Sequence, residues 1–562
     1  MIRRNSFVIS KALKNFLSAS VMTSLAGQLA VTTDAVIVSH MVGPNALSAI
    51  NMVMPLTMFF SCFSILIGLG ASILAAKAIG NHDKERVDRI FTISLILLTV
   101  AGIAVSGLSF SYCHEIVGIA CDNIIIAPLA YEYTRVITSG ALFLIISNGI
   151  NYFVSTDGNP GLVTKGVAAG AVANAILDIM LIEQMGISGS AWATIINYVI
   201  TLVIVSSHFF TKRSSYHLVN PIKGAAAYII RNLYEGLPLM LGNLLLGGAV
   251  FIINSMILDA AGADGAYIWA VCLQVLMLTF VILNGVGNAM LSIGGIQMGE
   301  KDYNGIKILT TLALKLVSIV LTSFMLLILL FPGIPEYMFA ADDTLTNIDI
   351  SGPIRIFSLF LVPFAITLVM RFLFQILEHR ILSLIMSAGQ LVGIIASLWI
   401  FIKIAPDGIW WSFPVSAAVL ILIQLAATFA IYLVKRDISP LTLIPKRPDG
   451  ELSADFSVSY SNGFTGHAIE RIDSFLTECN VTTAKRKVLK ESYRNLIAKL
   501  EQHKGKKKSF DIHVRVIGEN VMTIVRDAGK RIDSLTLSSD KAYNIEHKYM
   551  YGQNVFLLQL KL

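Results

Sequence analysis

The sequence predicts an all-α polytopic membrane protein with twelve transmembrane helices in two six-helix bundles, followed by a small α+β domain. Mean hydropathy is +0.71 and only 14% of the residues are charged, whereas a soluble protein carries roughly a quarter charged residues. The hydrophobic part of the chain also repeats itself once, and the composition changes abruptly after Arg436. These three observations predict the fold class.

Twelve long hydrophobic segments follow one another through the first three quarters of the chain. Each is long enough to cross a membrane, because about 20 residues at 1.5 Å per residue span roughly 30 Å of hydrocarbon. The expected spans lie near residues 16–39, 50–76, 90–111, 131–155, 161–182, 187–210, 233–258, 264–290, 308–331, 352–377, 381–404 and 408–434.

The second six segments resemble the first six. Residues 68–72 (GLGAS) match residues 285–289 (GVGNA), and residues 185–187 (MGI) match residues 407–409 (DGI). Each half holds an even number of spans, so both enter the membrane in the same direction. Such halves are related by an axis along the membrane normal, and substrate sites then lie between them near the midplane. We therefore expect bundles at residues 1–215 and 216–437.

The net charge of +7 is distributed by position. Loops on one side are rich in Lys and Arg, and those on the other side are acidic. Because positive loops remain in the cytoplasm, we expect a protein of the plasma (inner) membrane with both termini cytoplasmic. Positive charge that is divided among the loops on one side of the spans sets the orientation of the spans in the membrane. Nucleic-acid binding is therefore not expected.

The tail has the composition of a soluble domain. Prolines in residues 438–463 predict a stiff linker, and residues 464–562 form the expected α+β domain. Hydrophobic residues recur at helical spacing in 467–479 and 482–502, whereas they alternate like strands in 510–517, 521–526 and 554–561.

Two carboxylates inside the expected spans are the candidate functional residues. A carboxylate at the centre of a span costs at least about 2.5–3.5 kcal/mol, so it indicates function by default. Asp34 lies in the first span and Asp178 in the fifth, four residues from Asn174 and thus on the same helical face. Thr194 in the sixth span could bring a hydroxyl to the same group. The cluster could exchange a proton or bind Na+ through hard oxygen ligands, and the residues leave the choice between H+ and Na+ open.

Other polar residues are weaker candidates. Arg371 and Gln274 could line a cavity, although such side chains also snorkel or join helices. Cys113 and Cys121 share an expected external loop and could form a disulfide in an oxidising compartment.

Several stretches resemble the multidrug and toxic-compound extrusion (MATE) family. The resemblance is carried by residues 33–40 (TDAVIVSH), 68–81, 157–160 (DGNP), 174–178 (NAILD) and 186–194. It implies a V-shaped pair of six-helix bundles that exports cationic or amphiphilic compounds in exchange for H+ or Na+. The acidic residues are similar to those of the DinF-like branch, whose ion site lies in the amino-terminal bundle. On this resemblance Asp34, Asn174, Asp178 and Thr194 form the coupling site.

The tail resembles the histidine-kinase-like ATPase fold in the short form seen in anti-sigma factors. On this resemblance Glu491 and Asn495 would handle water and Mg2+, and Asp527 with Gly529 would read adenine. A Gly-x-Gly phosphate lid is missing, so backbone N–H groups to cradle phosphates are lacking and ATP hydrolysis is not expected. The expectation is a degenerate regulatory or interaction domain, open to a cytoplasmic regulatory protein, with ATP binding as an alternative.

The leading function is secondary-active efflux of organic cations or amphiphiles, without enzymatic activity or a required cofactor. The alternatives are a flippase for a lipid-linked saccharide, which would favour a cavity richer in Arg and Lys, and a membrane-anchored sensor that signals through the tail.

Overall fold

The computed structural model describes residues 4–120, 124–211, 214–220, 225–335, 350–446, 452–459, 464–502, 509–517, 520–529, 531–532 and 543–560. Within them, eleven helices are long and apolar enough to cross a membrane. The pair α6 (Ile126–Ser139) and α7 (Ala141–Thr156) is bent by 53° and raises the number of spans to as many as twelve. The expected fourth span is this broken pair.

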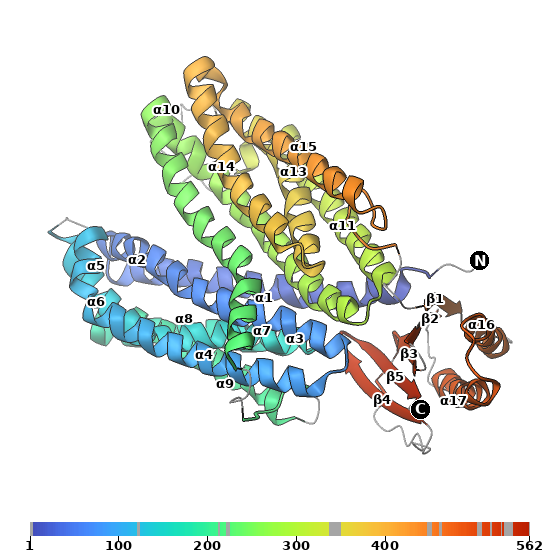
Figure 1. Ribbon diagram of the computed structural model, residues 1–562. Helices are drawn as coiled ribbons and strands as arrows, with labels where there is room; N and C mark the ends of the chain where they lie inside the picture. Colours follow the sequence, from blue (N-terminus) through green and yellow to red (C-terminus); the bar gives the residue numbers. More distant parts are fainter. Residues whose placement is uncertain are drawn as a thin grey trace.

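The amino-terminal bundle contains the first half of the chain (Figure 1). Its elements are α1 (Phe7–Met41), α2 (Pro44–Phe63), the π-helix η1 (Ser64–Leu69), α3 (Gly70–Gly80), α4 (Lys84–Ser111), α5 (Cys113–Ala120), α6, α7, α8 (Pro160–Met185), α9 (Ile187–Ser206) and the short η2 (Ser207–Phe210). Helix α1 packs along α8, and α8 packs along α9. These two contacts bring the first, fifth and sixth spans together.

The carboxyl-terminal bundle repeats this plan with fewer breaks. Its elements are α10 (Ala225–Gly299), α11 (Tyr303–Leu330), α13 (Ser351–Ile376), α14 (Arg380–Ile404), η4 (Pro406–Trp411) and α15 (Ser412–Val434). The two bundles also share a glycine turn between their first two spans. Gly43 (φ 114°) separates α1 from α2, and Gly262 (φ 67°) breaks α10. Both adopt a backbone conformation that residues with a side chain rarely adopt.

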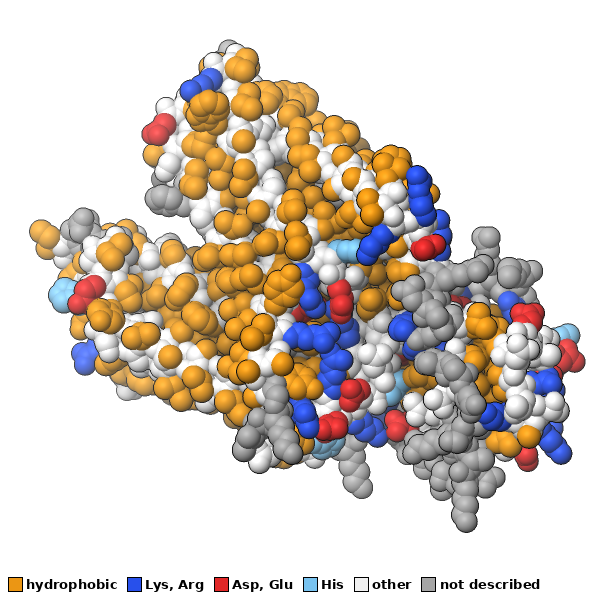
Figure 2. All heavy atoms as spheres, viewed as in Figure 1, with side chains coloured by type: hydrophobic (Ala, Val, Ile, Leu, Met, Phe, Trp, Pro, Cys, Tyr) orange, Lys and Arg blue, Asp and Glu red, His pale blue; other side chains and the backbone are white. Residues whose placement is uncertain are grey.

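The two bundles meet at the end of the molecule where the tail lies and diverge toward the other end (Figure 1). They meet along α3 and α10, where backbone approaches backbone so closely that a Cβ on Gly70 would lie 2.7 Å from the nitrogen of Gly236. Lys77 of α3 donates to Glu235 of α10 at 2.9 Å and to Glu378 at 3.1 Å. Figure 2 shows hydrophobic side chains over both bundles, with Lys, Arg, Asp and Glu gathered toward the tail end.

The tail is a five-stranded antiparallel sheet with two helices on one face. The strands β1 (Leu452–Ser459), β2 (Ser509–Ile517), β3 (Asn520–Asp527), β4 (Tyr543–Met550) and β5 (Gln553–Leu560) lie in the order β1-β2-β3-β5-β4. Helices α16 (Phe464–Glu478) and α17 (Thr483–Gln502) pack on the hydrophobic side chains of the sheet.

Strand β1 corrects the expected linker at residues 438–463. It pairs with β2 from Leu452↔Val516 to Ser459↔Ser509, so the tail domain begins before residue 464. Polar and hydrophobic residues alternate in this strand, as in an edge strand with one buried face. The neighbouring prolines nevertheless favour a linker, which is why the sequence predicts one here. Strand β4 was not predicted either.

Candidate functional site

A cavity of about 540 Å³ lies within the amino-terminal bundle. Helices α1, α2, α6, α7, α8 and α9 line it, together with Asn288 of the other bundle. A volume of this size lies within the range of ligand pockets for small organic molecules, about 300–1,000 Å³. Among the residues that the structure describes, the lining contains one carboxylate, Asp34, and no Lys, Arg or His. The cavity is therefore suited to a cation and ill suited to an anion.

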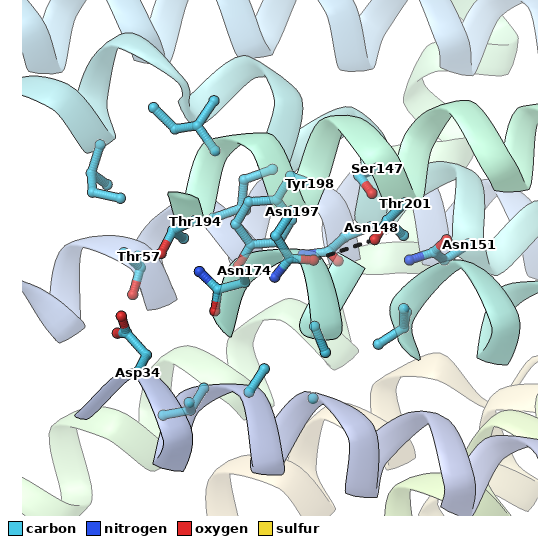
Figure 3. A pocket seen from close by; sticks show the side chains of 18 of the residues that line it. Asp34, Thr57, Ser147, Asn148, Asn151, Asn174, Thr194, Asn197, Tyr198 and Thr201 are labelled. Atoms are coloured by element: carbon cyan, nitrogen blue, oxygen red, sulfur yellow. Dashed lines mark hydrogen bonds between the residues drawn. The ribbon is translucent and has the colours of Figure 1, made fainter. Parts of the chain in front are cut away.

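Amide and hydroxyl groups supply most of the polar lining. Figure 3 shows Asn174, Thr194, Asn197 and Tyr198 gathered on one side of the cavity, with Asp34 facing them from α1. Asn148, Asn151 and Thr201 continue this polar surface along the cavity. The cavity therefore offers amide and hydroxyl groups, which can donate or accept hydrogen bonds, next to apolar side chains of α1 and α2.

The structure brings Asp34 and Asp178 together. Their carboxyl groups interact directly, since α1 packs along α8. Asp178 is fully buried, and neither of its oxygens accepts a hydrogen bond from a described protein donor. Two carboxylates in contact repel each other unless they share a proton or a cation.

Ser190 and Tyr133 belong to the same group, although the sequence analysis did not single them out. The Ser190 hydroxyl donates to Asp34 Oδ1 at 2.7 Å. Buried Tyr133 of α6 lines the cavity and forms a side-chain hydrogen bond with Thr194. Ser190 lies four residues before Thr194 and so on the same face of α9, which is a signal that the sequence contained.

Each predicted residue of the coupling site has a definite place. Asp34, Asn174 and Thr194 line the cavity, whereas Asp178 neighbours Asp34 but is not part of the lining. Asn174 is buried, and its side-chain NH₂ has no partner among the described residues. An unpartnered buried amide beside two carboxylates leaves hydrogen-bonding capacity for a ligand or water.

Arg371 and Gln274 are not part of this cavity. The Arg371 guanidinium donates to Ser387 at 3.0 Å and lies over the ring of Phe372, within the carboxyl-terminal bundle. Gln274 is exposed on α10. Of the two cysteines, Cys113 is buried as a free thiol, and Cys121 lies outside the described residues.

The candidate nucleotide residues of the tail lie in two different environments. Asp527 is fully buried and accepts hydrogen bonds from the Gly529 backbone N–H and the Asn554 side chain, both at 3.2 Å. Glu491 and Asn495 are exposed on α17. The Asp527 bonds hold together the turn that follows β3.

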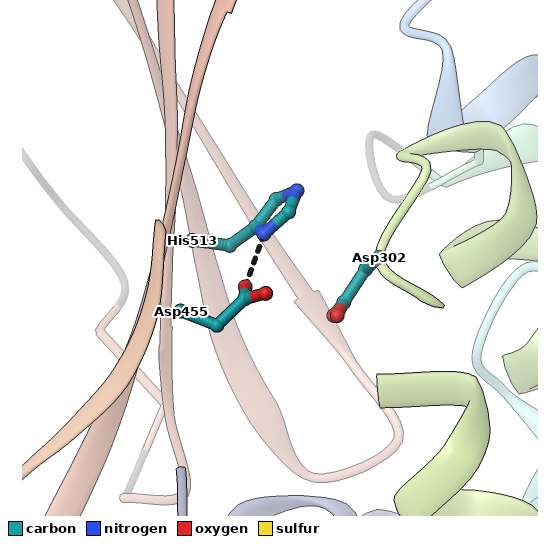
Figure 4. A group of neighbouring side chains, drawn as sticks. All are labelled: Asp302, Asp455 and His513. Atoms are coloured by element: carbon teal, nitrogen blue, oxygen red, sulfur yellow. Dashed lines mark hydrogen bonds and ion pairs between the residues drawn. The ribbon is translucent and has the colours of Figure 1, made fainter. Parts of the chain in front are cut away.

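Asp302, Asp455 and His513 lie close together where the tail meets α10 and α11 (Figure 4). Their ligand atoms have the proximity needed for a metal ion, but two arginines are already there. Arg4 donates to both oxygens of Asp302, at 2.7 and 2.6 Å, and Arg526 donates to it at 3.2 Å. This group is therefore an ion-pair network in which guanidinium groups balance the carboxylates.

The chain matches the family model described as MatE over residues 19–182 and 238–399. Two curated relatives are a probable multidrug resistance protein, YoeA, of Bacillus subtilis (22% identical over 205 residues, 35% of this chain and 42% of the relative) and an FAD transporter of Shewanella oneidensis (26% over 210 residues, 35% and 45%). The matched part thus spans less than half the length of each curated relative.

Solved structures share the fold of the two bundles. An outward-facing multidrug resistance MATE family transporter of the MOP superfamily superposes with a TM-score of 0.70 at 23% identity, covering 75% of this chain and 96% of that one. A MOP superfamily transporter from Pyrococcus furiosus gives 0.68 at 24% identity, covering 73% and 93%. The uncovered part of this chain is of the size of the tail.

Proposed function

Because this chain belongs to the MatE family, with a multi-pass membrane fold, we propose that it exports organic cations or amphiphilic compounds in exchange for H+ or Na+. The proposal places the tail end of the molecule in the cytoplasm, as the Lys- and Arg-rich loops predict. The divergent ends of the bundles then face outward. The observation that carries the proposal is the cavity whose described lining residues include Asp34 and no cationic side chain.

The contact between Asp34 and Asp178 supports exchange at this cavity. A proton or Na+ held between the two carboxyl groups relieves their repulsion. An organic cation that reaches Asp34 from the cavity provides the same neutralisation, so the two compete for one negative charge. Antiport results if the protein must bind either the coupling ion or the organic cation before each conformational change. The gradients suffice, since 100 mV supplies about 2.3 kcal/mol per charge.

The same lining argues against two other cargoes. The FAD transported by the S. oneidensis relative and the pyrophosphate of a lipid-linked saccharide are both anionic, and phosphates are bound most strongly by Arg and Lys, neither of which is among the described residues of the lining. Arg371 belongs to the other bundle, where it is bonded to Ser387.

Purified full-length protein in proteoliposomes tests the proposal. A pH gradient and a Na+ gradient are imposed separately, and movement of ethidium, of a neutral amphiphile and of FAD is followed. We expect ethidium to move against one of the two gradients and FAD to remain in place. Ethidium movement that ignores both gradients, or FAD movement that follows one, would overturn it.

A further inference from the structure

One face of the tail sheet is polar and yet buried. In β2, Phe510, Ile512, Val514 and Val516 pack in the core beneath α16 and α17. The alternate residues Asp511, His513 and Arg515 point to the opposite face and are 1%, 1% and 4% exposed. Charged side chains are almost never this buried unless they are paired, so this face is built to be covered.

The amino-terminal bundle covers part of the face. Lys548 of β4 donates to Asp157 between α7 and α8 at 2.5 Å, and the Tyr551 hydroxyl donates to the Thr156 carbonyl at 2.5 Å. Lys11 and Asn15 of α1 donate to the carbonyl oxygens of Ala528 and Tyr551. Burial alone would raise the pKa of Asp157, but the Lys548 ammonium and the bond from His208 hold it below its usual range.

The carboxyl-terminal bundle covers the rest through the short loop between α10 and α11. Arg526 of β3 pairs with the Glu300 carboxylate, and Arg515 donates to the Glu300 carbonyl at 2.8 Å. The polar contacts of the tail with this bundle gather at residues 300–302, and Met550 and Tyr551 share a hydrophobic cluster with Ile293 and Ile296 of α10. The polar contacts with the other bundle are spread over α1 and the α7–α8 turn.

Arg4 joins all three bodies. It belongs to the segment leading into α1, donates to Asp302 of the carboxyl-terminal bundle, and donates to Asp511 of the tail at 3.0 Å. Its side chain is fully buried, and the neighbouring carboxylates raise its pKa despite the burial. Such a junction is stable only while the three bodies stay together.

We propose that the tail is a cytoplasmic clamp that holds the two bundles together at their tail end and so favours the outward-open state. Opening of this end separates α3 from α10, and the sheet cannot then keep its contacts with both Asp157 and Glu300. We expect the contact between Glu300 and Arg526 to break first, because fewer polar interactions join the tail to the carboxyl-terminal bundle than to the amino-terminal bundle. The proposal rests on the proposed function for its biological meaning, but its geometry can be measured without transport.

The distance between two spin labels at the far ends of the bundles shows whether the tail holds the near ends together. Labels on Asn45→Cys and Asp264→Cys are placed in the full-length chain with its five native cysteines replaced, and their distance distribution is recorded. Arg526→Glu should lower the ratio of the population at the long distance to the population at the short distance by about tenfold or more, since a broken buried ion pair leaves charges uncompensated. The reversed pair Arg526→Glu with Glu300→Arg should restore part of the ratio, since a carboxylate at position 526 still faces Asp302. Exposed Arg494→Glu on α17 is the matched control.

Cross-linking provides a second measurement that tolerates a destabilised tail. Arg526→Cys and Glu300→Cys joined by a short reducible cross-linker should fix the long distance and stop ethidium movement, and reductant should release both. An unchanged distance distribution in Arg526→Glu together with continued transport in the cross-linked protein would overturn the clamp. A distribution that shifts as expected in a protein that moves no cation would instead overturn the proposed function alone.

Discussion

The hydroxyl of Ser190 on α9 donates a 2.7 Å hydrogen bond to the carboxylate of Asp34 on α1. Asp178, on α8 between these two helices, contacts Asp34 without any protein donor of its own among the described residues. Asp34 is therefore held in place by Ser190 and faces both Asp178 and the cavity. This arrangement gives one carboxylate a fixed orientation and leaves the other to share a proton or cation.

Replacement of the cavity carboxylate should strongly reduce gradient-driven transport. Asp34→Asn removes the negative charge that cargo and coupling ion share, and loss of one partner of a buried charged contact costs about 2–5 kcal/mol, or at least about thirtyfold in affinity. We expect gradient-driven ethidium movement in proteoliposomes to fall by that factor, and Asp178→Asn to do the same. Asp259→Asn, exposed on α10, should move ethidium at the parental rate; a parental rate in Asp34→Asn would exclude Asp34 from the mechanism.

Loss of the Ser190 hydroxyl should impair transport without abolishing it. Ser190→Ala deletes a hydrogen bond to a charged acceptor, worth about 1.5–3 kcal/mol, but leaves both carboxylates in place. The apparent affinity for the coupling ion should change several-fold or more, as measured by titration of initial rates. Ser188→Ala is the control, since Ser188 lies nearby on α9. Identical titrations for both variants would show that Ser190 does not orient Asp34.

Hydrophobicity and the repeat were sufficient to predict most of the membrane fold. The order of spans follows from apolar length. The bend between α6 and α7 was not predictable in this way, because residues 131–155 read as one continuous apolar segment.

The candidate site could be predicted in part, because buried carboxylates in spans are rare. Asp34 and Asp178 were recognised by that rule, whereas Ser190 and Tyr133 resemble the many hydroxyls that bond only within their own helix. The role of Asp157 could not be predicted, since it depends on Lys548, 391 positions away in the sequence. Glu235 was missed for the same reason: its partners Lys77 and Arg380 come from α3 and α14.

Close backbone contact between the bundles should not tolerate a side chain. A Cβ at Gly70 would lie 2.8 Å from the carbonyl oxygen of Asn232 and the Cα of Gly236, so Gly70→Ala forces α3 and α10 apart. We expect the spin-label distance between the far ends to shorten and thermal stability in detergent to fall by about 1–3 kcal/mol, as for an overpacked core. Gly27→Ala is a matched control in α1, since nothing lies within 4 Å of its Cβ position. Equal behaviour of the two variants would contradict the tight α3–α10 contact.

Tail docking should weaken in mild acid because of His82. This residue, between α3 and α4, lines a cavity between the bundles and the tail. Burial, together with Arg526, Arg515 and Lys548, lowers its pKa from 6.5 to about 4, while Glu546 acts in the opposite direction. The ring is therefore neutral when the tail is docked, whereas in water it binds a proton at its ordinary pKa of about 6.5. Because the pKa of His82 is lower in the docked state, acid protonates the undocked protein first and so favours undocking. Docking therefore has its full strength above about pH 6.5 and weakens as the pH falls from about 6.5 toward about 4.

The expected loss is at most about tenfold in the ratio of docked to undocked protein per pH unit, because one proton is taken up. Energy transfer between dyes on Arg494→Cys in α17 and Lys435→Cys after α15 measures that ratio in the full chain. Of the junction carboxylates, Asp302 and Asp157 have pKa values held below their usual range by Arg4 and Lys548 despite burial, whereas burial raises the pKa of Asp511. A variant of His82 therefore separates its response to acid from that of Asp511. His82→Asn should flatten the pH dependence while leaving the ratio at pH 8 near that of the parent. A parent and variant that respond to acid with the same slope would assign the pH dependence to a different group.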